Sequence, residues 1–321
     1  MVSSMKRVAI LNDYQGVALS SADWSALEGR VETTVFRHHI DDVDELVAAL
    51  DGFEVVVAMR ERTPFPRSVL ERLGALELLV TTGARNAAID TAACADLGIT
   101  YCGTGGRVQS TAELTWALIL ACARHLPTEV GNVADGGWMT TVGTDLYGAM
   151  LGLCGLGRIG GMVAEVGKAF GMELIAWSQN LTEERCGEIG ARLVSKKELF
   201  ERSDFVSVHL VLSERSTGLI GAAELRAMKP SAWLINTSRG PICDEDALVV
   251  ACRDGWIAGA GLDAYGTEPL PPHHLFRTLG NVLATPHIGY VSNNVYEIFF
   301  ADVVADIAGF LDGEPVRVVQ S

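Results

Sequence analysis

Short apolar runs rich in β-branched residues alternate with segments of helical periodicity along the first hundred residues. The runs read RVAILN, VETTVFR, FEVVVAMR, LELLVTTG and GITYCG, and stretches such as DDVDELVAAL lie between them. This alternation is typical of βαβ units, in which a crossover helix joins two parallel strands. The pattern therefore predicts a parallel sheet of about five strands before residue 105.

A second series of the same kind starts with the run AMLGLC and continues as ELIAWSQ, ARLVS, FVSVHLVL, AWLINTS, IAGAGLDAY and NVLATPH. Before it, residues 110–126 predict a long apolar helix, with Ser110 as its N-cap and Glu113 three residues later. Residues 127–148 show no regular period and are expected to be irregular. The expected fold class is α/β, with two doubly wound parallel-sheet domains.

The last segment, residues 289–313, predicts a helix that has no strands of its own to cover. Its apolar positions recur every three or four residues, at Val295, Ile298, Phe299, Val303, Ile307 and Phe310. Such a helix is expected to cross back to the first domain. We therefore predict one domain from residues 1–104 and 289–321, and a second from residues 105–288.

Charge and composition narrow the class of partner. The 321-residue chain carries 40 acidic and 25 basic side chains, a net charge of −15 that disfavours nucleic acid and anionic membranes. The longest apolar run, around Leu114–Ala123, is about half of the roughly 20 residues that a membrane span requires, and the N-terminus lacks a signal-peptide core. The seven cysteines form no C-x-x-C pair, so we expect reduced thiols in a cytoplasmic protein and no metal site.

The stretch LGLCGLGRIGG contains the spacing G-x-G-x-x-G at Gly155, Gly157 and Gly160. A buried-strand run precedes it and a helical pattern follows, which is the context of a dinucleotide-binding turn. Gly155 permits the tight turn, Gly157 allows close approach of a pyrophosphate, and Gly160 allows the helix to pack on the strand. Arg158 and Ile159, at the start of the helix, would offer their N–H groups to the phosphates.

The acidic residue that usually accepts the ribose hydroxyls about 20 positions further on is missing. The next strand ends in Ser178, Gln179 and Asn180, with no carboxylate among them. On the glycine spacing alone, a turn without a ligand therefore remains an alternative.

Several further motifs lie downstream in one order: MKPSAWLINTSRGPICDEDAL, GAGLDAYGTEPL and VLATPHIGY. With LGLCGLGRIGG, SDFVSVHLVLSERSTGLI and the mid-chain STAELTWALIL, they resemble the D-isomer-specific 2-hydroxyacid dehydrogenases, a family that includes phosphoglycerate, glyoxylate/hydroxypyruvate and D-lactate dehydrogenases. The resemblance runs across residues 105–290 and is looser before them. It implies a Rossmann cofactor domain inserted into a flavodoxin-like substrate domain.

The resemblance carries the catalytic roles onto Arg239 of TSRG, Glu268 of GTEP and His287 of TPHIG. Chemistry supports the set, because reducing a 2-oxoacid requires a cation that binds and polarises the substrate and a proton donor for the alkoxide. Arg239 would be the cation and His287 the acid/base, with Glu268 fixing the imidazole tautomer. Each of the three, taken singly, also fits an ordinary surface or loop residue.

Further residues follow from the same resemblance. It implies that His209 lines the adenine pocket, that Asp263 accepts from the nicotinamide carboxamide, and that the backbone near Thr237 lies on the same ring. Asp263 alternatively caps a helix or a turn. In the first domain it implies that the backbone of the loop at Gly83, Ala84 and Arg85 holds the substrate carboxylate. Arg60 either faces the substrate, together with Arg85, or pairs with Glu61; if both arginines face inward, the substrate carries a second anionic group.

Several alternatives remain open. The cofactor is NAD or NADP, because the small neutral Ser178 removes a repulsion against a 2′-phosphate without adding a cation. The resemblance extends to NAD(H)-binding corepressors that act as scaffolds, so the substrate is a small 2-oxoacid or 2-hydroxyacid only if the chain is an enzyme. Formate oxidation is disfavoured because Glu268 stands where formate dehydrogenases carry Gln. The apolar helix over residues 110–126 also predicts a homodimer.

Overall fold

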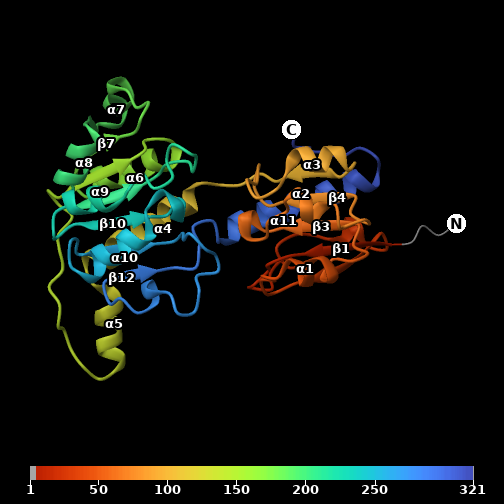
Figure 1. Cartoon of the computed structure of the whole chain (residues 1–321), viewed down its shortest axis with the longest axis horizontal. Helices are drawn as coiled ribbons and strands as arrows, with labels where there is room; N and C mark the ends of the chain where they lie inside the picture. The colour runs from red at the N-terminus through yellow and green to blue at the C-terminus, as the bar shows by residue number, and fades with distance from the viewer. Residues whose placement is uncertain (1–4, 321) are drawn as a thin grey trace. The chain divides into compact units, whose positions relative to one another are not determined.

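The computed structural model describes residues 5–320, which fold as two compact units (Figure 1). The first consists of the chain up to Arg107 together with the segment from Val291, and the second is Val108–Tyr290. The chain thus leaves the first unit, forms the whole of the second and returns.

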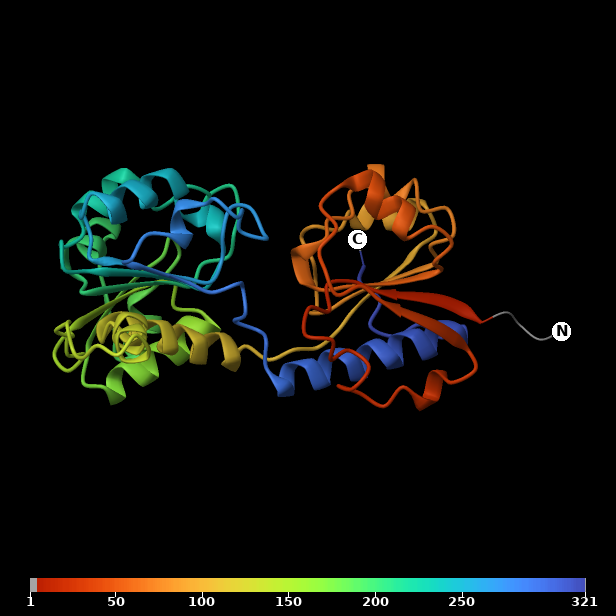
Figure 2. The ribbon, with the colours of Figure 1, turned by 90° about the horizontal axis from the view of Figure 1, so that it is seen from below.

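The first unit contains a five-stranded parallel sheet in the order β2-β1-β3-β4-β5, the flavodoxin-like arrangement expected from the sequence. Figure 2 shows helix α11 on one face of this sheet and the short helices α1, α2 and α3 on the other. The elements are β1 (Lys6–Ile10), β2 (Val31–Val35), α1 (Val43–Ala49), β3 (Val55–Ala58), α2 (Arg67–Leu70), β4 (Leu78–Thr81), α3 (Thr91–Asp96), β5 (Thr100–Gly103) and α11 (Asn293–Leu311).

The chain end after α11 is fastened to the edge of this sheet. The Val319 N–H donates to the Tyr101 carbonyl of β5 at 2.8 Å, and the Gly103 N–H donates to the Arg317 carbonyl at 3.2 Å. The Arg317 guanidinium lies 3.3 Å from Asp302 and 3.1 Å from the fully buried Asp306, both on α11. One arginine therefore contacts two carboxylates and holds the terminal segment on the helix.

The second unit contains a seven-stranded parallel sheet in the order β12-β11-β10-β9-β6-β7-β8. Renumbered from its first strand, this is the Rossmann order with one strand added. The elements are α4 (Gln109–Ala123), α5 (Leu126–Ala134), β6 (Met150–Cys154), α6 (Arg158–Ala169), β7 (Glu173–Trp177), α7 (Glu183–Ile189), β8 (Arg192–Leu193), α8 (Lys196–Arg202), β9 (Phe205–Val208), α9 (Ala222–Ala227), β10 (Trp233–Asn236), α10 (Glu245–Arg253), β11 (Gly259–Leu262) and β12 (Val282–Ala284).

Two apolar cores lie on the two faces of this sheet. Side chains of α4, α6 and α7 fill one, including Trp116, Val163 and Cys186. The other is filled from α8, α9 and α10, including Phe200 and Leu225. Because both faces are covered, the strands are apolar throughout rather than alternating, which is why they read as continuous runs in the sequence.

Helix α4 differs from its prediction in where it begins and in what its apolar side chains contact. It begins at Gln109 with Val108 as N-cap and no capping side chain, so the predicted Ser110 cap is wrong. Trp116, Ile119 and Cys122 are among the residues that it buries against its own unit. Contacts within one chain therefore account for the apolar composition of α4, which had been taken to predict a homodimer.

The segment after α4 was expected to be irregular, but α5 occupies its first part. Helix α5 and the chain that follows it project from the rest of the second unit (Figure 1). The Glu129 carboxylate of α5 accepts bonds from the Thr140 and Thr141 N–H groups at 3.0 and 2.7 Å. These bonds, with the Thr141 hydroxyl foremost, lower the pKa of Glu129 to about 2 and tie the loop to the helix.

Among the described residues, no helix combines the length and the apolar character needed to cross a membrane. Across the same part of the chain, no group of three or more His, Cys, Asp or Glu side chains is arranged to hold a metal ion.

Candidate active site

The glycine turn joins β6 to α6 in the second unit. Gly155 has a φ of +98°, in the region that favours glycine, and its N–H donates to the Trp177 carbonyl at 2.9 Å. A Cβ on Gly155 would lie 2.6 Å from the His209 carbonyl oxygen, and one on Gly160 would collide with the Gly155 carbonyl. Both glycines are therefore required by close backbone approach.

The N-terminus of α6 faces open space. Its N-cap is Gly157, which has no capping side chain and would meet no atom within 4 Å if it carried a Cβ. The first bond inside the helix is donated by the Gly161 N–H, so the N–H groups of Arg158, Ile159 and Gly160 have no acceptor within it. Unpaired N–H groups and the helix dipole together suit a diphosphate, and these residues fit that group of a dinucleotide.

His209 supports this turn from the end of β9. Its Nε2 atom lies 2.8 Å from the Ser207 hydroxyl, and its Cβ packs 3.4 Å from the position that a Cβ on Gly160 would occupy. Burial lowers the pKa of His209 to about 4, so the ring is neutral at physiological pH. These contacts fix the glycine turn.

The end of β7 lies beside the glycine turn, because Trp177 pairs with Cys154 in the sheet. Ser178, Gln179 and Asn180 follow directly and bring no carboxylate. A cation that was not singled out from the sequence lies nearby: Arg185 of α7 donates from Nε to the Leu156 carbonyl at 3.3 Å. Its exposed guanidinium also contacts Glu188 at 2.8 Å, so its charge is partly balanced.

Arg239 follows β10 on a loop that is braced from within. The buried Asn236 donates to the Arg239 carbonyl and accepts from the Ser238 N–H, both at 3.0 Å. The Ser238 hydroxyl donates to the Val208 carbonyl at 2.8 Å, and the Arg239 guanidinium donates to the Ser238 carbonyl at 2.8 Å. A Cβ on the next residue, Gly240, would collide with the Tyr265 backbone, so glycine is needed there.

Thr237, on the same loop, turns its side chain toward α4. Its hydroxyl lies 2.8 Å from the hydroxyl of Thr115, and both residues are buried. The side chain therefore anchors the loop to the helix and leaves only the backbone of Thr237 for a ligand.

Glu268 and His287 form a short carboxylate–imidazole contact. Oε2 of Glu268 lies 2.6 Å from Nδ1 of His287, and the side chains are 23% and 17% exposed. The other carboxylate oxygen accepts from the Tyr265 N–H at 3.0 Å. An ionised Glu268 therefore keeps a proton on Nδ1 of His287, and Nε2 is the atom through which the ring can exchange a proton with a ligand.

The backbone of His287 is held in an unusual conformation. Its φ is +53°, which is uncommon for a residue with a side chain. Asp263 accepts the N–H groups of Ile288 and Gly289, each at 2.8 Å, and also the Thr285 hydroxyl at 2.6 Å. Both Asp263 oxygens are thus used by the loop that carries His287.

Asp263 is 1% exposed, and burial raises the pKa of its carboxyl group. Residues in rare backbone conformations persist only where the surroundings impose them, and they concentrate at functional sites. The structure therefore places Asp263 as a cap of the turn that follows His287, which is the alternative to a cofactor contact that the sequence left open.

In the first unit, Arg60 lies over the glycine loop that follows β4. Its backbone φ is +49°, its Nη1 donates to the Thr82 carbonyl at 3.2 Å, and a Cβ on Gly83 would overlap this guanidinium. Arg60 also lies 3.5 Å from Glu61, so the pairing considered as an alternative is present. The pairing of Arg60 with Glu61 does not prevent its guanidinium from lying over the glycine loop.

The amides of this loop are not equivalent. The Gly83 N–H donates to the Thr104 hydroxyl at 2.7 Å and is not available to a ligand. The N–H groups of Ala84 and Arg85 find no acceptor within residues 5–320, and both residues are exposed. Of the three N–H groups predicted to hold the substrate carboxylate, the one at Gly83 is therefore ruled out, and those of Ala84 and Arg85 remain.

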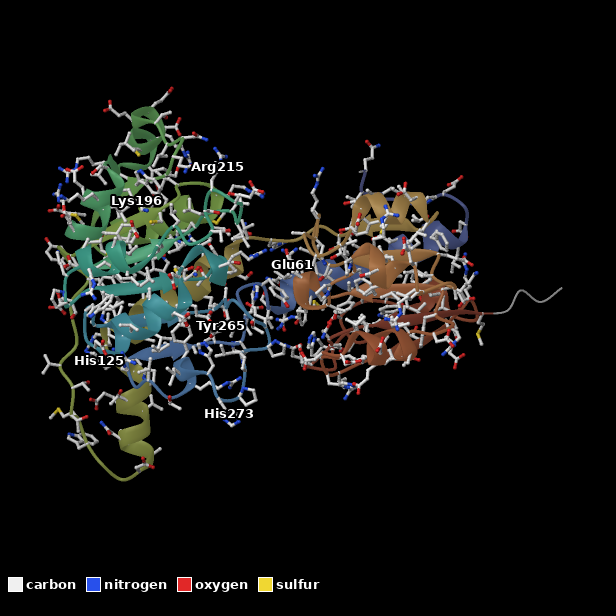
Figure 3. The ribbon with its side chains drawn as sticks, viewed as in Figure 1. Glu61, His125, Lys196, Arg215, Tyr265 and His273 are labelled. Carbon is white, nitrogen blue, oxygen red and sulfur yellow. The ribbon has the colours of Figure 1, made fainter. Side chains whose placement is uncertain are left out.

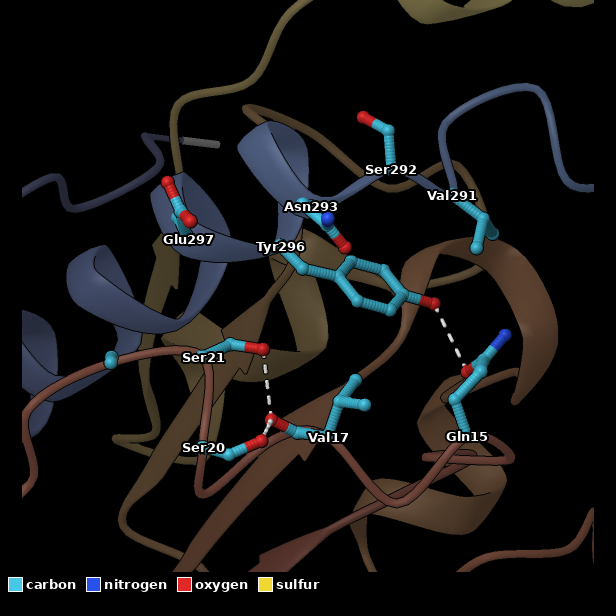
Figure 4. A pocket seen from close by; sticks show the side chains of 10 residues that line it. Gln15, Val17, Ser20, Ser21, Val291, Ser292, Asn293, Tyr296 and Glu297 are labelled. Carbon is cyan, nitrogen blue, oxygen red and sulfur yellow. Dashed lines mark hydrogen bonds between the residues drawn. The ribbon is translucent and has the colours of Figure 1, made fainter.

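A hollow of about 600 Å³ also opens in the first unit, between the loop after β1 and the first turns of α11 (Figure 4). The Tyr296 hydroxyl crosses it to Oε1 of Gln15 at 3.2 Å. The Ser20 and Ser21 hydroxyls both donate to the Val17 carbonyl on its other side. No residue singled out from the sequence lies in this hollow.

The Rossmann strand order, the glycine turn and the bare helix terminus define a dinucleotide-binding α/β protein. Comparison with known proteins identifies its family. A model of the NAD-binding domain of the D-isomer-specific 2-hydroxyacid dehydrogenases matches residues 116–289.

Among curated proteins, the chain is 34% identical over 287 residues to a glyoxylate reductase of Korarchaeum cryptofilum, covering 87% of this chain and 83% of that protein. It is 44% identical over 209 residues to a glyoxylate reductase of Aeropyrum pernix, covering 62% of each. The match with the D-3-phosphoglycerate dehydrogenase of Synechocystis, at 34% identity, spans 50% of that protein.

Among solved structures, a phosphoglycerate oxidoreductase from Vibrio cholerae O395 superposes with a TM-score of 0.91 at 35% identity, covering 96% of this chain and all of that one. The chain therefore belongs to the D-isomer-specific 2-hydroxyacid dehydrogenase family, whose members are NAD-dependent oxidoreductases.

Proposed function

We propose that the protein interconverts a 2-oxoacid and a D-2-hydroxyacid, using NAD(H) or NADP(H), with His287 as the general acid and base. The observation that carries this proposal is the 2.6 Å contact between Glu268 and Nδ1 of His287, at the carboxyl edge of the sheet that holds the glycine turn. Family membership supports an oxidoreductase, and the pair supplies the proton chemistry that such a reaction requires.

In the direction of reduction, the bound dinucleotide supplies a hydride to the carbonyl carbon of the substrate. The carbonyl oxygen gains negative charge as this C–H bond forms, and Nε2–H of His287 donates a proton to it. Glu268, hydrogen-bonded to Nδ1, stabilises the protonated imidazole from which this proton comes, and the ring is neutral after the transfer. In the direction of oxidation, neutral His287 removes the hydroxyl proton.

Arg239 is proposed to bind the substrate carboxylate and polarise the carbonyl. A guanidinium presents several N–H donors in one plane, which matches a carboxylate. Asn236 and Ser238 brace the backbone of its loop, so the position of the cation is set before the substrate binds.

The first unit is proposed to bind the rest of the substrate, and the second unit the dinucleotide. The exposed N–H groups of Ala84 and Arg85 are suitable donors for a carboxylate. Arg85 adds a cation to this loop region of an acidic protein, and Arg60 adds a second one that Glu61, 3.5 Å away, partly balances. Both favour a substrate with a second anionic group.

NAD(H) is the cofactor that the family indicates, and we propose that NADP(H) is also accepted. A carboxylate after β7 would repel a 2′-phosphate, but Ser178 stands there. The guanidinium of Arg185, bonded to the glycine turn through Leu156, adds positive charge on this side. Efficient use of NADPH would support this part of the proposal, and a preference for NADH of more than about a hundredfold would contradict it.

The direct test follows the absorbance of NADH and NADPH at 340 nm with glyoxylate, hydroxypyruvate, pyruvate and phenylpyruvate. Turnover of at least one of them, lost in the His287→Asn variant, is the expected result. Asparagine is chosen because it tolerates the left-handed backbone at residue 287. Tight dinucleotide binding without turnover of any 2-oxoacid would instead favour a scaffold.

We also propose that the protein is a homodimer, with the arm formed by α5 and residues 135–147 at the interface rather than α4. The arm exposes large apolar side chains, namely Leu126, Val130, Val133, Trp138, Met139, Val142 and Tyr147. An apolar cluster of this size is typical of an interaction surface. Because the seven cysteines are all buried free thiols, we further propose a reducing, cytoplasmic location.

A further inference from the structure

Tyr265, labelled in Figure 3, follows Asp263 and Ala264 at the end of β11. It bonds to Glu268 and to the loop that carries His287. Its backbone N–H donates to Oε1 of Glu268 at 3.0 Å. Since the other oxygen of this carboxylate faces His287, the place of the Tyr265 backbone decides how Glu268 meets the imidazole.

The side chain of Tyr265 reaches the other half of the pair. Its hydroxyl lies 2.8 Å from the Thr285 carbonyl and 3.1 Å from the Leu262 carbonyl. A phenol has one hydrogen to donate, so the two carbonyls share a bifurcated hydrogen bond, in which the distance to Thr285 is the shorter. The Thr285 carbonyl also accepts the N–H of His287 at 2.9 Å, so the Tyr265 hydroxyl and His287 meet at one atom.

Packing prevents Tyr265 from adopting another position. The residue is 6% exposed, and its ring lies 6.4 Å from the ring of Phe276 between centroids. The backbone of Gly240 lies against the backbone of Tyr265, which leaves no room for displacement on that side. Burial also raises the pKa of the hydroxyl, which therefore stays protonated and remains a donor.

We propose that Tyr265 is a positioning residue that holds Glu268 and His287 in register through its backbone N–H and its hydroxyl, respectively. This inference rests on the acid–base role proposed for that pair. A tyrosine that only filled space would affect folding stability, whereas a positioning residue must also affect the titration of His287 and the rate of the proton-transfer step.

The test is Tyr265→Phe, which keeps the ring and removes only the hydroxyl. The matched control is Tyr296→Phe in the first unit, where another buried tyrosine, 7% exposed, loses one hydroxyl bond to Gln15. The titration of His287 is followed by NMR of the labelled imidazole in the full chain, with the signal assigned by its absence in His287→Asn. Steady-state rates are measured over pH in parallel.

In Tyr265→Phe, we expect the titration midpoint of His287 to move to lower pH, because the loop that carries the imidazole loses its bond to the hydroxyl and the ring is held less well against the carboxylate. We expect kcat to fall about tenfold, a fraction of what acid–base catalysis contributes, with KM for the dinucleotide unchanged. Tyr296→Phe should leave both quantities as in the wild type.

A wild-type midpoint and pH profile in Tyr265→Phe would overturn the inference, whatever happened to the melting temperature. Equal shifts in Tyr265→Phe and Tyr296→Phe would overturn it too, because they would reflect general loosening. The NMR measurement requires no turnover, so it separates this inference from the proposed function. If no 2-oxoacid is reduced, the proposed reaction fails, while the midpoint still reports whether Tyr265 holds the pair.

Discussion

Oε2 of Glu268 lies 2.6 Å from Nδ1 of His287, although 18 residues separate them in the chain. The two residues follow β11 and β12, which are neighbours in the sheet, so their loops leave the same edge. The proposed role of His287 as proton donor rests on this contact, which leads to the first prediction.

Replacing Glu268 by Gln should lower kcat/KM for the best 2-oxoacid by about 10²-fold, because an amide does not stabilise a protonated imidazole. The pH at which reduction is half-maximal should move down in the variant. Rates measured over pH with saturating dinucleotide test both effects. An unchanged pH profile with an unchanged rate would mean that the pair is structural.

Asp263→Asn should disturb the turn at His287. Ile288 and Gly289 donate to different oxygens of the carboxylate, and an amide has only one oxygen, so its NH₂ group would face one of these two donors. We expect a loss of about 1–3 kcal/mol in the free energy of unfolding and a fall in kcat. Calorimetry and steady-state kinetics measure the two losses, with Asp254→Asn, at an exposed surface pair, as the control. Equal stability of the two variants would mean that the bonds from Ile288 and Gly289 to Asp263 do not stabilise the turn.

Ser178→Asp should convert the protein to NADH use. The new carboxylate would accept from the ribose hydroxyls of NADH and repel a 2′-phosphate, so kcat/KM for NADPH should fall at least about tenfold more than that for NADH. Arg185→Ala should also lower kcat/KM for NADPH more than that for NADH. Asn180→Asp, two residues away, is the positional control. If both cofactors weaken equally in Ser178→Asp, the cofactor proposal is wrong.

The buried Asp306 predicts a pH dependence of stability. Burial, only partly offset by Arg317, raises the pKa of its carboxyl group from the ordinary value of 3.8 to about 7 in the folded protein. The folded state therefore binds more protons than the unfolded state between those values, and this stabilisation is present below about pH 4 and lost as the pH rises through about 7. Over this range the loss is about 4 kcal/mol.

Asp306→Asn should remove that dependence. The free energy of unfolding of the variant should therefore rise relative to that of the wild type as the pH increases from 5 to 8, by on the order of 1 kcal/mol per pH unit. Melting temperatures of both proteins across this range are the measurement. Parallel curves would show that Asp306 does not titrate there. Asp312→Asn, at an exposed pair with Arg30, controls for the change of one surface charge.

Val130→Asp should make the protein monomeric, because Val130 is 67% exposed on α5 and a charge there would be desolvated in an apolar interface. Size-exclusion chromatography with light scattering gives the mass. Val43→Asp, at a 47% exposed site on α1, should remain dimeric. A wild-type monomer near 34.3 kDa would contradict the dimer proposal itself.

The sequence by itself determined the strands and helices of both sheets, because strands buried on both faces read as apolar runs and amphipathic helices separate them. It also pointed to Gly155, Gly157 and Gly160, since a tight turn between a strand and a helix leaves few other residue types. The resemblance supplied Arg239, Glu268 and His287, but not how they are held.

Tertiary structure decided the features that depend on contacts between distant segments. Helix α5 was missed because none of its side chains is buried in one chain, so it has no buried apolar face. The predicted cap at Ser110 is wrong because helix α4 begins at Gln109 and its N-cap is Val108, two residues before Ser110. The use of the Gly83 N–H by Thr104, the bond from Arg185 to Leu156 and the clamp of Asp263 around His287 join residues 21, 29 and 24 positions apart. No local pattern encodes such bonds, because backbone N–H and carbonyl groups find these partners only when parallel strands bring their carboxyl ends to one edge.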